Sequence, residues 1–213
     1  MERPLGLKVK IGGNEVSIHF LEGNSTKETH PLLQNKLIPR GELASVGDFL
    51  RRRGYKLSFT TGVFDMVHIG HARYLELARS LGNVLFVGLN TDESVKRLKG
   101  PNRPVLRESE RAEMLSFIQF VDYITPFPED NGAEVIRILK PDTYLCVEGS
   151  WEGDIETKAE VIAMTEIGGQ VFRTPRQDPF LSTTDIIHKI SEQNTQQIIS
   201  DFQRFMSERN KSA

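Results

Sequence analysis

The chain of 213 residues lacks several features that would place it in a special class of protein. Its one cysteine, Cys146, excludes an internal disulfide and a cysteine-based metal site, and it fits a reducing compartment. No apolar run approaches the roughly 20 residues that span a bilayer, and the first residues lack the apolar stretch of a signal peptide. We therefore expect a soluble, cytoplasmic protein with no membrane partner.

An excess of charge of one sign is also missing. Lys and Arg number 27 and Asp and Glu 29, for a net charge of −2, whereas proteins that coat nucleic acid carry a strong basic excess. Hydrophobic residues make up 38% and charged residues 26%, which is ordinary globular usage. The composition predicts a domain with a real core and no nucleic acid partner.

Charge is distributed unevenly along the chain. The first 57 residues hold ten Lys and Arg against six Asp and Glu, so their net charge is +4 and the rest carries −6. We predict an N-terminal extension over residues 1–40, a main domain over 41–190 and a helical tail over 191–213.

In the extension, residues 7–11 and 16–20 alternate apolar with polar around Gly12-Gly13-Asn14, which predicts a β-hairpin.

The main domain alternates strand and helix patterns. Apolar, strand-like runs occupy residues 57–61, 84–89, 123–126, 143–147 and 170–173. Helical spacing occupies residues 43–53, 71–81, 107–120, 132–139 and 158–167. This succession predicts a doubly wound α/β fold, with a mostly parallel sheet and helices on both of its faces.

The tail has the spacing of an amphipathic helix. Its apolar residues fall on one side: Ile198, Ile199, Phe202, Phe205 and Met206. Such a helix either docks on the domain or meets another subunit, and we expect a homodimer.

The most informative stretch lies where the first strand of the domain ends and a helix begins. Gly62 and Gly70 allow close approach of the backbone to a ligand, and a helix N-terminus favours an anion. His68 and His71 are three residues apart, so both can reach one phosphate from the first helical turn. The alternatives are histidines that only satisfy loop and cap positions, or a zinc site, for which no third ligand has suitable spacing.

Read as G-x-F-D-x-x-H-x-G-H, this stretch resembles the signature of the nucleotidylyltransferase superfamily, which has a Rossmann-like fold. Further segments are similar to the adenylyltransferase domain of bacterial ADP-heptose synthases, which transfers AMP from ATP to a heptose 1-phosphate. These segments are Arg97-Leu98-Lys99-Gly100, expected in a loop, Phe127-Pro128-Glu129-Asp130, and Ser182-Thr183-Thr184. The resemblance covers residues 57–190.

The resemblance implies attack by an acceptor phosphate on the α-phosphorus of a nucleoside triphosphate, with release of pyrophosphate and with Mg²⁺ bound to the triphosphate. It implies catalytic roles for His68, His71 and Lys99, acceptor binding by Asp65, Lys99 and Arg103, and no protein ligand to a metal. The alternatives are that Asp65 holds a turn, that Lys99 is an exposed surface lysine, and that Ser182-Thr183-Thr184 caps a helix. The nucleotide would contact Thr61, Gly62, Val63, Phe64, Gly70, Asn90, Arg111, Gly149, Trp151, Ser182, Thr183 and Thr184.

The segment after the fourth strand departs from the heptose pattern. The heptose enzymes typically have V-K-G-G-D-Y where this chain has Val147-Glu148-Gly149-Ser150-Trp151, and Trp151-Glu152-Gly153 resembles glycerol-3-phosphate cytidylyltransferases. Transfer of CMP from CTP to glycerol 3-phosphate or another small alcohol phosphate is therefore an alternative.

Two other classes compete with a nucleotidylyltransferase. H-I-G-H also occurs in class I aminoacyl-tRNA synthetases, but this chain has little room for an anticodon domain and no K-M-S-K-S-like loop. A non-catalytic nucleotide-binding scaffold is the other alternative, which would not need both histidines.

Overall fold

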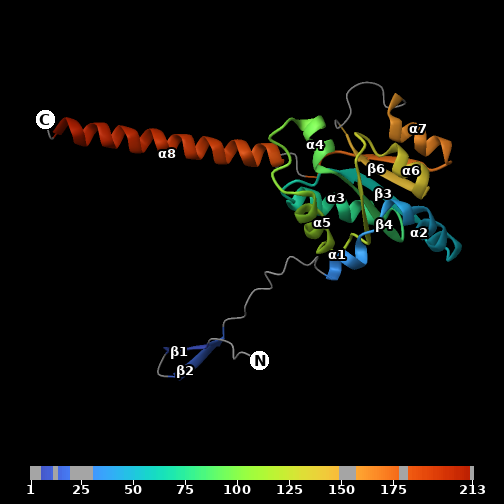
Figure 1. Cartoon of the computed structure of the whole chain (residues 1–213), viewed down its shortest axis with the longest axis horizontal. Coiled ribbons are helices and arrows are strands. Elements are labelled where there is room, and N and C mark those ends of the chain that lie inside the picture. Colours follow the sequence, from blue (N-terminus) through green and yellow to red (C-terminus); the bar gives the residue numbers. More distant parts are fainter. Residues whose placement is uncertain (1–5, 12–13, 20–30, 149–156, 178–181, 212–213) are drawn as a thin grey trace.

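A computed structural model describes residues 6–11, 14–19, 31–148, 157–177 and 182–211. Within these residues a central sheet of five parallel strands has the order β5-β4-β3-β6-β7 (Figure 1). The strands are β3 (Leu57–Gly62), β4 (Val84–Asn90), β5 (Tyr123–Phe127), β6 (Thr143–Val147) and β7 (Gln170–Thr174). Parallel strands need crossover connections, and helices supply them.

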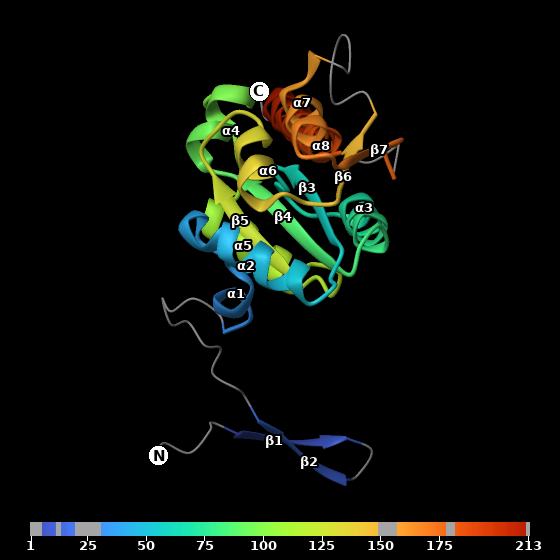
Figure 2. The ribbon, with the colours of Figure 1, turned by 90° about the vertical axis from the view of Figure 1, so that its right-hand side faces the viewer.

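Helices cover both faces of this sheet (Figure 2). On one face pack α2 (Arg40–Arg52), α6 (Ala133–Leu139) and α7 (Ala159–Glu166), and their core includes Phe59 and Phe86. On the other pack α1 (Pro31–Lys36), α3 (Ile69–Ser80) and α5 (Glu108–Ser116), and their core includes Leu85 and Leu89. All seven residues of β4 are buried, as expected for a strand covered on both sides. The predicted doubly wound α/β fold is confirmed.

The predicted hairpin is also present. Strands β1 (Gly6–Ile11) and β2 (Asn14–His19) pair antiparallel, with Gly6 opposite His19 and Ile11 opposite Asn14.

The structure corrects the prediction that Arg97, Lys99 and their neighbours lie in a loop. They form the end of a helix, α4 (Asp92–Lys99), whose Thr91 side chain caps the first turn by accepting from the Ser94 amide. The helix buries only Ser94 and Val95, so its sequence has no apolar periodicity by which to recognise it. The predicted helix over 107–120 is shorter, because α5 ends at Ser116 and tight turns follow.

Two predicted boundaries also move. Leu33 is buried in the core and Ile38 donates its amide to the Ile124 carbonyl, so the main domain starts before residue 41. At the other end α8 (Thr183–Lys211) is a single helix that crosses the expected boundary at residue 191 without a break. It extends away from the sheet (Figure 1). No helix among the described residues is long and apolar enough to span a membrane.

Candidate active site

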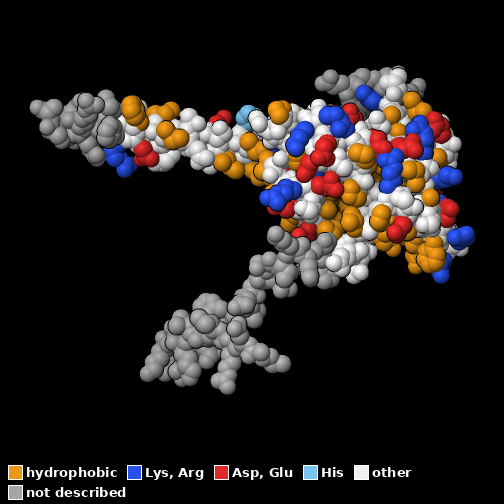
Figure 3. Space-filling view, in the orientation of Figure 1, with side chains coloured by type: hydrophobic (Ala, Val, Ile, Leu, Met, Phe, Trp, Pro, Cys, Tyr) orange, Lys and Arg blue, Asp and Glu red, His pale blue; other side chains and the backbone are white. Residues whose placement is uncertain are grey.

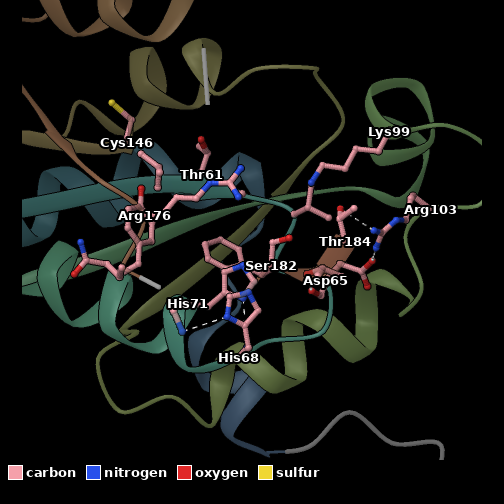
Figure 4. Close-up of a pocket in the computed structure, with 18 of the residues that line it drawn as sticks. Thr61, Asp65, His68, His71, Lys99, Arg103, Cys146, Arg176, Ser182 and Thr184 are labelled. Atoms are coloured by element: carbon pink, nitrogen blue, oxygen red, sulfur yellow. Dashed lines mark hydrogen bonds and ion pairs between the residues drawn. The ribbon is translucent and has the colours of Figure 1, made fainter. Parts of the chain in front are cut away.

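A cavity of about 340 Å³ lies at the carboxyl ends of β3 and β6 (Figure 4). Strands β4 and β5 lie on one side of β3, whereas β6 and β7 lie on the other. The connections reverse direction between β3 and β6, and open α/β sheets bind ligands at such a switch point. Most predicted site residues line this pocket: Thr61, Gly62, Val63, Phe64, Asp65, His68, Gly70, His71, Lys99, Arg103, Ser182, Thr183 and Thr184.

The loop that joins β3 to α3 has a strained backbone. Phe64 and Met66 have φ values of 49° and 52°, in the left-handed region that residues other than glycine rarely adopt. Between them the Asp65 carboxylate is only 5% exposed. It accepts hydrogen bonds from the Val105 amide (2.9 Å), the Leu106 amide (3.0 Å) and the Arg103 guanidinium (2.9 Å).

These contacts decide what Asp65 does. Both of its carboxylate oxygens are held by donors of the protein, and its backbone carbonyl accepts from the Thr183 hydroxyl at 2.6 Å. The residue therefore positions the loop and ties it to the start of α8. These contacts agree with the turn-holding alternative, and acceptor binding by Asp65 stays a prediction.

The two histidines lie against each other at the N-terminus of α3, with ring centroids 4.0 Å apart. The Gly70 amide donates to Nδ1 of His68 at 3.2 Å, and the His68 amide donates to Nδ1 of His71 at 3.4 Å. A ring nitrogen that accepts carries no proton, so a neutral imidazole held in this way carries its proton on Nε2. Both rings are thus set to donate from Nε2.

The charge state of His71 follows from its surroundings. Burial, together with the neighbouring His68 and the positive Lys99, lowers the pKa of His71 to about 4, although Asp65 opposes this shift. His71 is therefore neutral near pH 7 and donates a hydrogen bond without a net charge of its own.

Three cationic side chains face the histidines from other parts of the chain. Lys99 comes from the end of α4, Arg103 from the following loop and Arg176 from the segment after β7, and Figure 4 shows Lys99 and Arg176 approaching from opposite sides. Partial burial lowers the pKa of Lys99, and Arg103 and Arg176 lower it further, while Asp65 raises it. Three cations held this close together repel one another when the pocket is empty. A bound polyanion, such as a triphosphate, would offset this repulsion.

The start of α8 supplies hydroxyl groups to the same pocket. The Asp185 amide donates to the Ser182 hydroxyl oxygen at 3.1 Å and the Ser182 amide donates to the Asp185 carboxylate at 2.9 Å, so the pair caps the helix. Thr184 accepts from the Arg103 guanidinium at 3.3 Å. The capping interpretation is confirmed, and the capped N-terminus borders the pocket, where its free amides suit a phosphate.

Two predicted nucleotide-binding residues lie outside the pocket. Asn90 is buried, and its side-chain amide donates to the Ser94 hydroxyl and the Glu129 carbonyl. Arg111 is fully buried, and its guanidinium donates to the Asp92 carboxylate (2.7 Å) and to backbone carbonyls of Val63 (2.7 Å), Asn90 (2.9 Å) and Leu106 (3.1 Å).

Arg111 therefore holds the loop between β3 and α3 in place, and its role as a ligand of the nucleotide stays a prediction. All of its hydrogen bonds go to protein acceptors, and its side chain is fully buried. Gly149 and Trp151 lie outside the described residues.

The structure adds site residues that the sequence analysis did not select. These residues include Arg176, which belongs to none of the motifs quoted from the sequence, and Cys146. Cys146 is the next-to-last residue of the predicted strand 143–147, where the rule about strand ends could have found it. Burial raises the pKa of the Cys146 thiol to about 11, so this group is a lining residue and not a nucleophile.

No cluster of three His, Cys, Asp or Glu residues able to hold a metal occurs among the described residues.

Comparisons with known proteins agree with this geometry. A family model described as cytidylyltransferase-like matches residues 59–189. The bifunctional protein HldE of Syntrophotalea carbinolica is 38% identical over 190 residues, which is 88% of this chain and 37% of that protein. HldE of Sulfurimonas denitrificans is 41% identical over 150 residues, covering 68% of this chain and 30% of that protein.

The chain thus spans about a third of the length of these relatives. A solved structure of a lipopolysaccharide core biosynthesis protein from Thermoplasma volcanium is 26% identical, has a TM-score of 0.50, and covers 59% of this chain and 100% of that one. Because the family model covers more than half of the chain, including the histidine loop and the start of α8, this protein belongs to the cytidylyltransferase-like family of nucleotidyltransferases.

Proposed function

We propose that the chain transfers AMP from ATP to a sugar 1-phosphate, most specifically a heptose 1-phosphate, and releases pyrophosphate. The proposal is supported by the curated relatives, since HldE is the ADP-heptose synthase whose adenylyltransferase domain the motifs resemble. It is supported equally by the residues Arg97-Leu98-Lys99-Gly100 and Phe127-Pro128-Glu129-Asp130, which match that domain rather than a cytidylyltransferase.

The observation that carries the proposal is the opposition of two histidines, of which His71 is neutral near pH 7, and three cations across one pocket. An oxygen of the acceptor phosphate attacks the α-phosphorus of ATP, a new P–O bond forms, and the bond from the α-phosphorus to the bridging oxygen of pyrophosphate breaks. The attacking oxygen is already an anion, so no protein base is required. The site must instead align two polyanions and stabilise the charge that develops on the leaving pyrophosphate.

The described side chains divide these tasks between them. The Nε2 protons of His68 and His71 point to the triphosphate and strengthen their hydrogen bonds as negative charge grows in the transition state. Lys99 lies between the two groups of phosphates, with Arg103 beside it and Arg176 opposite, and these cations offset the repulsion between the substrates. The hydroxyls and amides at the start of α8 hold a phosphate of the nucleotide.

Magnesium would accompany the triphosphate, because it prefers oxygen ligands and keeps several waters. Among the described residues that line the pocket, the acidic one is Asp65, and its oxygens accept from Arg103 and two amides. The residues therefore fit a metal that is carried by the nucleotide's phosphates and not by a carboxylate cage.

A second candidate is transfer of CMP from CTP to glycerol 3-phosphate or a similar small alcohol phosphate. The observation that favours it is Arg176 in the pocket, which follows Pro175 as in those cytidylyltransferases, together with the sequence Trp151-Glu152-Gly153. Base choice depends on a few hydrogen bonds whose loss leaves buried polar groups unpaired, so a few residues are enough to change it.

Pyrophosphate release tests both candidates. The chain is incubated with each of the four nucleoside triphosphates and a panel of sugar 1-phosphates and polyol phosphates, and kcat/KM is compared for ATP and CTP. We expect turnover with ATP and a heptose 1-phosphate. A tenfold preference for CTP would establish the cytidylyl alternative, and no turnover with any pair by folded protein would favour a nucleotide-binding scaffold.

We also propose that the protein works as a cytoplasmic homodimer. The chain has one cysteine, so it has no internal disulfide that would need an oxidising compartment.

A further inference from the structure

Helix α8 carries exposed apolar side chains well beyond the part that meets the domain (Figure 3). The exposed fractions are 48% for Ile190, 68% for Ile198, 51% for Ile199 and 63% for Phe202. A helix in water takes most of its stability from burying its apolar face, and soluble monomers rarely expose large contiguous apolar patches. The length of α8 and its exposed apolar side chains together indicate that another protein surface covers this side of the helix.

The apolar residues of α8 form two groups on one side of the helix. Ile187 and Ile190 belong to the first group and Ile198 and Phe202 to the second, and the seven residues between the groups, 191–197, are polar. Ile187 and Ile198 are 11 residues apart, which is about three turns of an α-helix at 3.67 residues per turn, so the two groups lie on the same side. Together they form one apolar stripe that is interrupted at its centre.

The first half of this stripe forms one wall of a groove on the domain. The groove has a volume of about 430 Å³, and its other wall is Met66 and Val105. Val105 is 52% exposed, and Met66 adjoins Asp65 in the histidine loop. An apolar group that entered this groove would contact both α8 and the loop that holds the catalytic histidines.

We propose that the groove is filled by α8 of a second copy of this chain, packed antiparallel, so that Phe202 of each copy enters the groove of the other. The chain carries both halves of such a contact: a groove at the N-terminal half of the stripe and exposed apolar side chains at the C-terminal half. A two-fold axis at residue 196 places Ile190 of one copy opposite Phe202 of the other and makes the interface self-complementary.

The order of the apolar residues along α8 favours the antiparallel arrangement over the parallel one. The axis at residue 196 places Ile187 of one copy opposite residue 205 of the other, just as it places Ile190 opposite Phe202, so each apolar group meets the other group. With 29 residues at about 1.5 Å each, the helices would overlap over about 40 Å.

Sedimentation equilibrium of the full chain tests the proposal. We expect a dimer at micromolar concentration and, for Phe202→Glu, a dissociation constant raised at least 100-fold with unchanged helix content by circular dichroism. The control is Gln196→Glu, which adds the same charge on the opposite side of α8 and should leave the dimer intact. A wild-type chain that is monomeric up to 100 micromolar, or a dimer that Phe202→Glu does not weaken, would overturn the proposal.

A charge pair tests the direction of packing. Ile190→Lys alone should also weaken the dimer, whereas the double variant Ile190→Lys with Phe202→Glu should restore it, because antiparallel packing places the two opposite charges against each other twice. In a parallel dimer like charges would meet at both positions, so a double variant as weak as the single ones would refute the antiparallel arrangement.

Discussion

The two sides of the pocket are built in different ways. On one side, His68 and His71 come from a single helical turn and take their orientation from amides at most three residues away. On the other side, Lys99, Arg103 and Arg176 come from a helix end, a loop and the segment after the last strand. The histidine side is organised locally, whereas only the tertiary structure brings the cationic side together.

The difference extends to the chemistry of each side. The histidines offer Nε2–H donors, which gain most from charge that appears during the reaction, whereas the cations attract charge that the substrates already carry. We therefore expect changes on the histidine side to act on kcat and changes on the cationic side to act on KM. Asp65 connects the two sides of the pocket. It lies in the strained loop that precedes the histidines, and its carboxylate accepts a hydrogen bond from the Arg103 guanidinium on the cationic side.

The largest expected effect comes from breaking this connection. Asp65→Ala leaves the Arg103 guanidinium and two amides without their acceptor, and we expect the free energy of unfolding to fall by about 4 kcal/mol in urea titrations. Asp130→Ala is the control, since Asp130 pairs with Arg97 at the surface with both side chains about half exposed, and it should change stability by less than about 1 kcal/mol. Equal losses in the two variants would mean that Asp65 does not join the sides.

The pKa of His71 predicts a pH dependence of stability on the histidine side. Because this pKa falls from 6.5 to about 4 on folding, the unfolded chain binds more protons between these pH values, and stability from this group increases with pH across that window. It is fully present above pH 6.5 and lost by pH 4, a change of up to about 3 kcal/mol. Chemical denaturation of the wild type and of His71→Gln from pH 4 to pH 8 measures this contribution. The difference between their free energies of unfolding should change with pH below pH 6.5 and be constant above it.

Removal of either histidine tests the assignment to the transition state. His68→Ala and His71→Ala should each lower kcat for pyrophosphate release about 100-fold, or about 2.7 kcal/mol, with little change in the dissociation constant of ATP. His188→Ala, on the exposed surface of α8, is the matched control and should have wild-type kcat. A loss of ATP affinity with unchanged kcat would instead make the histidines ground-state ligands.

The smallest expected effect lies on the cationic side. Lys99→Ala should raise the KM of the acceptor about tenfold, and Arg176→Ala the KM of the nucleotide by a similar factor, each about 1.4 kcal/mol. Lys96→Ala, an exposed lysine on the same helix as Lys99, should leave both constants unchanged. If Lys99→Ala changed only the KM of the nucleotide, Lys99 would belong to the other substrate.

The sequence analysis predicted the sheet better than it predicted the site. Strand β6 agrees with the prediction at both ends and β3, β4, β5 and β7 to within one residue. The apolar runs of β3, β4 and β6 are almost entirely buried, which is the pattern that reveals central strands of a parallel sheet. Helix α4 was missed, since it buries only Ser94 and Val95 and is identified by its Thr91 cap and its charges instead. Apolar periodicity therefore reveals elements that face the core and misses those that border the site.

Arg111 and Arg176 show the same limit in the site itself. Both are arginines among motif residues, and their sequence neighbourhood does not reveal which one is buried. Arg111 donates to Val63, 48 residues before it, and Asn90, 21 residues before it, so only the folded chain defines its acceptors. Arg176 enters the pocket because β7 lies beside β6 at the switch point.

The sequence by itself determined the alternation of strands and helices, the paired histidines and the cap at Ser182, because each depends on contacts within a few residues of the chain. The tertiary structure decided that Asp65 and Arg111 position the loop, that three distant cations share one pocket, and that α8 leaves its apolar stripe exposed. The physical reason is the range of the interactions. Hydrogen bonds within a helical turn are readable from residue spacing, whereas burial of a charge depends on which segments the sheet topology brings together.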